Sequence, residues 1–128
     1  EEFYKHVQKN ARGEIKAEAL YYSSFFKNQQ KEYIESNNIV QKLIANYSAY
    51  KYWGVKSYII MAKNYYGLKD VYQATYILEN VIKNFKQFEN LILEAQTTLD
   101  LIKEKEAKTN NSVSPTKKEI YKKEPKNE

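Results

Sequence analysis

The chain has 128 residues and a mass of 15.2 kDa, which suffices for one domain of ordinary size. Hydrophobic residues make up 42% and charged residues 29%, a balance typical of a folded chain rather than an intrinsically disordered one. The lack of cysteine excludes disulfides, thiolate zinc sites and cysteine nucleophiles. With only three glycines and two prolines, turn-rich β-sandwiches are disfavoured, and the composition favours an all-α fold.

The net charge is +5, and Arg12 is the only arginine among 21 basic residues. Because bases and phosphates are commonly read by bidentate arginine, we expect no specific nucleic-acid partner. No stretch approaches the ~18–20 apolar residues of a membrane span, so we expect no transmembrane segment. The chain begins at Glu1 and its one methionine is Met61, which indicates a processed product or a fragment of a longer protein.

Runs of apolar residues with helical spacing begin at the N-terminus. The first and shortest run, residues 3–11, stops at Gly13, where we expect the first helix to end. Residues 15–26 and 33–47 carry the next two runs with a short polar break between them, which predicts a helical hairpin.

Three further runs follow the hairpin, over residues 55–66, 74–85 and 88–102. Asp70, with Gln73 three residues later, matches a capping box and predicts the start of a helix. The last run becomes mostly charged towards its end, as a terminal helix does. In total the pattern predicts about five helices.

The composition changes at residue 109, after which only Ile120 and Tyr121 are large and apolar among polar and charged residues. Such a segment buries too little apolar area to offset its ordering entropy, so we expect residues 109–128 to form a disordered tail. The alternative is a short docking segment centred on Ile120 and Tyr121.

An internal repeat runs through the helical region. The pairs Lys9-Asn10, Ala45-Asn46 and Lys83-Asn84 each follow an apolar helix, at nearly regular intervals along the chain. A period in the high thirties with two helices per unit is typical of a helical solenoid. A simple helical bundle is the structural alternative.

The best unit resembles the tetratricopeptide repeat (TPR), whose pattern is W-x2-L-G-x2-Y followed by A-x3-F and a proline. Its matching residues are Tyr58, Met61, Ala62, Tyr65, Ala74 and Leu78, while Lys86 replaces the proline. The preceding unit matches through Ala19, Tyr22, Ser23, Phe26, Ser36 and Val40, with one extra residue in its turn and Ser48 in place of the proline. Small residues in this pattern let helices approach closely, and bulky ones fill the space between them.

The resemblance is closest to the C-terminal end of long TPR proteins of Bacteroidetes-type bacteria, carried by residues 17–22, 50–57 and 73–79. It implies that residues 1–12 end a preceding repeat, that 13–49 and 50–86 are two repeats, and that 87–108 form a capping helix before the tail, 109–128. It also implies further repeats upstream in the parent chain and a location in the periplasm or cell envelope.

The function implied by this resemblance is a non-catalytic scaffold that binds a protein or peptide segment on the concave face lined by the first helix of each repeat. In the TPR register the exposed residues of this face are Ser24, Lys27, Lys56, Lys63 and Tyr66. Three lysines beside a tyrosine would suit a partner with acidic groups. Two alternatives are a purely structural end of a long solenoid and a weak basic binder of anionic surfaces.

Residues that carry catalysis are sparse. His6 is the only histidine, so neither a histidine-based catalytic pair nor a histidine metal cluster can form. Glu14 and Glu18 lie one turn apart but among lysines, which indicates a solvated helix face. We therefore expect no enzyme activity, metal or cofactor. The aromatic residues 47–53 can either staple adjacent repeats together or anchor a partner.

Overall fold

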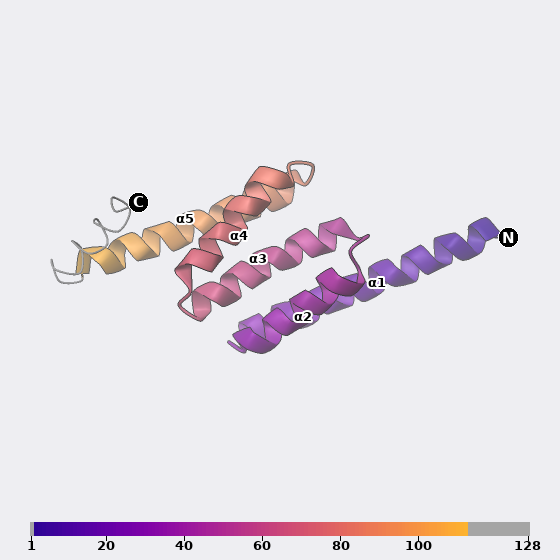
Figure 1. The fold of residues 1–128 in the computed structure, drawn as a ribbon, viewed down its shortest axis with the longest axis horizontal. Helices are drawn as coiled ribbons and strands as arrows, with labels where there is room; N and C mark the ends of the chain where they lie inside the picture. Colours follow the sequence, from indigo (N-terminus) through magenta and orange to yellow (C-terminus); the bar gives the residue numbers. More distant parts are fainter. Residues whose placement is uncertain (1, 113–128) are drawn as a thin grey trace.

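The computed structural model describes residues 2–112 and shows five helices (Figure 1). They are α1 (Glu2–Gln29), α2 (Tyr33–Asn46), α3 (Lys51–Gly67), α4 (Val71–Asn84) and α5 (Glu89–Ser112). No strand occurs among the described residues, so the predicted all-α fold is confirmed. Successive helices run antiparallel, and in the view of Figure 1 α2 lies in front of α1 and α4 in front of part of α5.

The predicted helix end at Gly13 is wrong, because α1 continues through it without a positive φ. A Cβ atom at this position would overlap the Tyr50 hydroxyl. That hydroxyl donates to the backbone carbonyl of Asn10 at 3.3 Å. The glycine therefore serves a close approach of an aromatic ring to a helix and is not a stop signal. The expected division between residues 12 and 13 falls inside a single helix.

The two turns α1–α2 and α3–α4 have the same geometry. Each contains one lysine with positive φ, Lys31 at 63° and Lys69 at 69°. In both turns the next amide donates to the carbonyl four residues before that lysine, at 2.9 and 2.8 Å. The predicted extra residue in the first turn is therefore absent. The two lysines are 38 residues apart, and the same offset of 38 relates the other equivalent positions of the two hairpins.

Helix α3 is the centre of the molecule and contacts each of the other four helices. Its Ile59 belongs to an apolar cluster formed with α4 and α5 that includes Leu78 and Leu91, while its Ile60 belongs to a second cluster with α1 and α2 that includes Leu43. Contacts also join α1 to α3 and α3 to α5. The odd-numbered helices thus form a connected row.

Polar side chains also hold the first three helices together. Asn64 of α3 is fully buried and donates to Ser36 Oγ and to Asn37 Oδ1 of α2, both at 2.8 Å. Its own carbonyl oxygen accepts from Asn28 Nδ2 of α1 at 2.8 Å. Ser36 in turn donates to the backbone carbonyl of Ser24 at 2.7 Å. Each of these hydrogen bonds crosses between helices, so the network fixes how they are placed relative to one another.

Helix α5 extends to Ser112 and so exceeds the predicted end of the capping helix at residue 108. The rest of the expected disordered tail, residues 113–128, lies outside the described residues, as does the candidate docking segment at Ile120 and Tyr121.

Candidate functional site

A cleft of about 490 Å³ lies between α3 and α5. Its lining residues are Lys63, Tyr66, Glu94, Thr97, Thr98, Leu101, Ile102 and Lys105. Two of the five predicted site residues, Lys63 and Tyr66, therefore lie together in one concave feature. They come from successive turns of α3, three residues apart, which places them on the same helix face.

Tyr66 is tied to α5 by two contacts. Its hydroxyl donates to Glu106 Oε2 at 3.0 Å, and Lys105 Nζ lies 5.9 Å from the centre of its ring. Burial, followed by the Glu106 carboxylate, raises the pKa of the Tyr66 hydroxyl, so it stays protonated at neutral pH. Lys63 makes no ion pair within the described chain. Among the described residues the cleft thus has two ammonium groups outside any ion pair, those of Lys63 and Lys105, beside an ordered aromatic ring.

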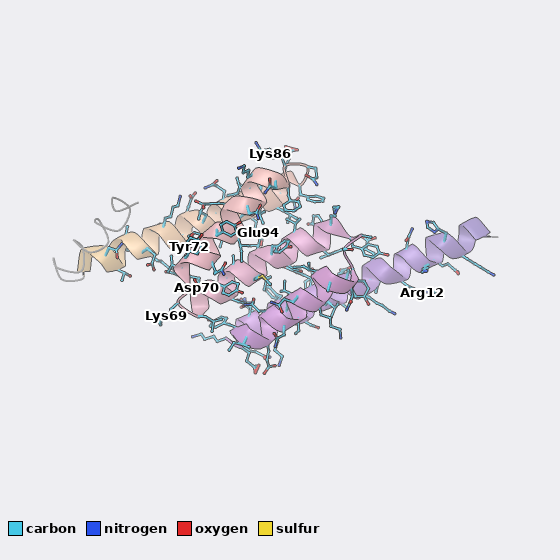
Figure 2. The ribbon with its side chains drawn as sticks, viewed as in Figure 1. Arg12, Lys69, Asp70, Tyr72, Lys86 and Glu94 are labelled. Carbon is cyan, nitrogen blue, oxygen red and sulfur yellow. The ribbon has the colours of Figure 1, made fainter. Side chains whose placement is uncertain are left out.

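Lys56 lies two turns before Lys63 on α3 but is committed to internal contacts. Its Nζ is 3.5 Å from Glu94 Oε1 of α5 and 5.3 Å from the centre of the Tyr21 ring of α1. In Figure 2 Glu94 lies towards the middle of the view, and its half-buried side chain lines the α3–α5 cleft. Burial, with Glu94 next, raises the pKa of Tyr21 to about 12. Lys56 therefore bridges three helices, and its charge is already balanced.

Ser24 does not lie on the accessible face. Its side chain is 0% exposed, and its hydroxyl donates to the Tyr21 carbonyl at 2.6 Å. At the offset of 38 between equivalent positions, Ser24 corresponds to Ala62, which is also fully buried. The prediction had assumed the extra turn residue, so it was displaced by one position, or about 100° around the helix. We leave Ser24 out of the candidate site.

The prediction for Lys27 is displaced by one position for the same reason. Lys27 pairs with Glu32 and Glu35 of its own hairpin, each at 3.2 Å, and lies at the α1–α2 turn instead of between α1 and α3. Hydrogen bonds to these two carboxylates raise the pKa of Lys27. This lysine therefore closes the turn.

The lining contributed by α5 was not predicted from the sequence. Thr97 and Leu101 are exposed, and the same offset of 38 makes them the equivalents of Ile59 and Lys63 of α3. That correspondence was visible in the sequence once the offset was accepted. It was missed because α5 had been assigned the role of a cap without a binding face.

The aromatic residues at the start of α3 pack against α1 on one side and against the start of α5 on the other. Trp53 lies 5.7 Å from Tyr21 of α1, and Tyr52 lies 5.7 Å from Phe88 just before α5, both measured between ring centres. The Tyr52 hydroxyl also accepts from Asn90 Nδ2 at 3.0 Å. These contacts correspond to the stapling role, one of the two roles expected from the sequence.

The next features concern histidine, metal-binding groups and membrane-spanning helices among residues 2–112. His6 is hydrogen-bonded to Asn10 at 3.2 Å on an exposed part of α1, and no group of three His, Cys, Asp or Glu side chains that could hold a metal occurs in this part of the chain. Among the same residues no helix is both long and apolar enough to cross a membrane.

Fold and site together define an all-α protein with a cleft between two parallel helices. Comparisons with family models, with curated proteins and with solved structures gave no match for the chain.

Proposed function

We propose that the chain is a TPR-like helical repeat that acts as a non-catalytic protein-interaction scaffold. Its α3–α5 cleft binds a segment of another protein that carries acidic groups. The observation that carries this proposal is the cleft itself, which is about 490 Å³ in volume and combines an exposed apolar side chain, hydroxyl groups and an unpaired lysine. Such a mixture is typical of binding sites, where apolar walls supply affinity and a few polar groups fix orientation.

The repeat assignment is supported by the equivalence of the two hairpins at an offset of 38. Helices α2 and α4 both have 14 residues, and they end at Asn46 and Asn84. Their C-cap residues Tyr47 and Phe85 have nearly the same backbone angles, φ −130° and ψ 40° against φ −128° and ψ 47°. Two hairpins with the same turns and second helices of equal length, joined through neighbouring odd-numbered helices, are what stacked helical repeats require.

The preference for an acidic partner follows from which charges in the cleft are already balanced. Glu94 is paired with Lys56, whereas Glu106 accepts from the neutral Tyr66 hydroxyl and keeps its negative charge. Lys63 forms no ion pair in the described chain, and Lys105 only approaches the Tyr66 ring. Lys63 and Lys105 thus supply two positive charges against the one negative charge of Glu106, which leaves an excess of one positive charge for an incoming carboxylate.

The test is selection of peptides from a random displayed library on the full chain, followed by affinity measurement by fluorescence polarisation. We expect enrichment of peptides with Asp or Glu beside an apolar residue. Affinity for the best peptide should fall about fivefold in Lys63→Met, which keeps the length of the side chain and removes its charge, because an exposed ion pair contributes at most about 1 kcal/mol.

The matched control is Lys83→Met, on exposed surface of α4 away from the cleft, which should bind as the wild type does. Equal affinity of the wild type, Lys63→Met and a third variant, Leu101→Glu, would exclude the cleft as the binding site. Selection of peptides without acidic residues would refute the proposed partner class while leaving the cleft in place.

A further inference from the structure

Helix α1 carries a second apolar face that is largely exposed, although its Tyr22 contacts Trp53 of α3 with 6.3 Å between the ring centres. Ile15 is 63% exposed, Tyr22 43% and Phe26 58%, and the small residues Ala11 and Ala19 on the same face are exposed as well. These five residues, at spacings of three or four, form one stripe along four turns of the helix. We name them the α1 stripe. In Figure 1 the N-terminal half of α1 extends beyond the other helices, so this part of the stripe is also free of neighbours.

The equivalent positions further along the chain are stacking faces. Adding 38 to positions 15, 19, 22 and 26 gives Trp53, Ser57, Ile60 and Asn64 of α3, and adding 38 again gives Leu91, Ala95, Thr98 and Ile102 of α5. Every one of these eight residues is buried or half-buried. Those of α3 pack on the α1–α2 hairpin, and those of α5 pack on α3 and α4. The α1 stripe is therefore the same stacking face without its neighbour.

Within the described chain the surfaces that such a face packs against are already covered. Helix α3 covers the α1–α2 hairpin, and α5 covers the α3–α4 hairpin. The outward side of α5 exposes one large apolar residue, Leu93, but is otherwise polar, since Asp100, Lys103 and Glu104 are all exposed on it. It offers no extended apolar face that could receive the stripe of another molecule. In a solution of this chain, the best complement to an α1 stripe is therefore a second α1 stripe.

We propose that the α1 stripe is the interface of a symmetric dimer in which two α1 helices pack antiparallel. The residues of the stripe are small at its N-terminal end and bulky at its C-terminal end. Antiparallel packing places Ala11 opposite Phe26 and Ile15 opposite Tyr22, with Ala19 beside the two-fold axis. The gap between the helices then has an even width, whereas parallel packing would set bulky rings against each other at one end and leave a void at the other.

The area available makes this a weak dimer. A large side chain offers about 150–250 Å² in all, so the exposed parts of Ile15, Tyr22 and Phe26 contribute roughly 100 Å² each. With the two alanines and the stems of flanking residues, each copy buries about 500 Å², or about 1,000 Å² in total, which is near the lower limit for a specific interface. We expect a dissociation constant on the order of 10 µM.

The first test is sedimentation velocity of the full chain from about 1 to 500 µM. The wild type should move from the monomer mass of 15.2 kDa towards twice that value. Ile15→Glu should stay monomeric, with association at least about thirtyfold weaker. The matched control is Ile34→Glu, because Ile34 is the same residue type at 65% exposure on α2, and it should dimerise like the wild type.

The second test uses the absence of native cysteine, so an introduced cysteine can pair only with its own copy. On mild oxidation Ala19→Cys should form a disulfide-linked dimer, because the antiparallel arrangement brings the two copies of residue 19 within disulfide reach. Ala11→Cys should not, because its opposite residue is Phe26. A wild type that remains monomeric at the highest concentration, an Ile34→Glu variant as impaired as Ile15→Glu, or equal cross-linking of the two cysteine variants would each overturn the proposal.

Discussion

Replacement of Asn64 by alanine tests whether the buried polar network holds the first hairpin against α3. The side chain of Asn64 is 0% exposed and makes three hydrogen bonds, all at 2.8 Å, to residues of α1 and α2. A hydrogen bond of this kind contributes about 1 kcal/mol net, so losing three costs about 3 kcal/mol. About one third of the cost falls on Asn37, whose side-chain carbonyl oxygen would remain buried without its Asn64 donor.

The assay is urea denaturation of the full chain followed by far-ultraviolet circular dichroism. We expect the free energy of unfolding to fall by about 3 kcal/mol in Asn64→Ala and the midpoint of thermal unfolding to fall by about 10 °C. The control is Asn38→Ala, since Asn38 lies next to the network residue Asn37 but is exposed, and its loss should cost less than about 0.5 kcal/mol.

Removing an amide also leaves a small void, so the hydrogen-bond contribution needs to be separated from volume. The double variant Asn37→Ala with Asn64→Ala should lose about 1 kcal/mol less free energy of unfolding than the sum of the two single variants. The reason is that Asn37→Ala removes the carbonyl oxygen that Asn64→Ala alone would leave buried without a donor. A loss in Asn64→Ala as small as that of the exposed control, or a coupling near zero in the double variant, would refute the reasoning.

Two further predictions concern glycine in α1 and α3 and the titration of a buried tyrosine. Gly54→Ala should raise the free energy of unfolding by about 1 kcal/mol in urea titrations, because no atom lies within 4 Å of the added methyl, whereas Gly13→Ala should lower it, because the methyl meets the Tyr50 ring. Burial raises the pKa of Tyr21 to about 12, so its contribution to stability is fully present below the unfolded pKa of about 10 and is lost between pH 10 and 12. Between pH 10 and 12 the free energy of unfolding of Tyr21→Phe should therefore fall by up to about 2 kcal/mol less than that of the wild type. Equal decreases of the urea midpoint in the two proteins would contradict the raised pKa of Tyr21.

The features that local sequence determines were predicted well. Asp70 accepts from the Gln73 amide at 3.1 Å, so the predicted cap of α4 is confirmed. The buried face of the apolar run over residues 74–85 was also identified correctly, since Ala74, Leu78 and Val81 are all buried. Both inferences depend on residues a few positions apart on one helix, for which spacing alone carries the information.

The face by which α1 packs could not be read in the same way. The apolar spacing pointed to Tyr22 and Phe26, yet the structure buries Ala17, Tyr21 and Ser24 against the neighbouring helices. Close helix contacts need small side chains, and these carry little hydrophobic signal. The buried face of α1 combines such small residues with Tyr21, so apolar spacing alone does not distinguish it from the exposed apolar face.

The one-residue correction in α1 also changes the expected charge of the binding face. The positions equivalent to Lys56 and Lys63 are Glu18 and Phe25 on α1, and Glu94 and Leu101 on α5. Neither neighbouring helix repeats the pair of lysines of α3, so the face is not a basic groove along its whole length. A bound segment would meet an ammonium group only near Lys63 and Lys105, with apolar side chains beside them.

Because an exposed ion pair contributes at most about 1 kcal/mol, raising the salt concentration should weaken binding of a selected acidic peptide by less than about tenfold. A basic surface that holds anions without specificity would lose far more affinity over the same range, since every neutralised charge adds to the salt dependence. Fluorescence polarisation at about 50 and about 500 mM NaCl distinguishes the two cases. A loss of several hundredfold would show that the net positive charge of the chain, rather than the α3–α5 cleft, attracts the peptide.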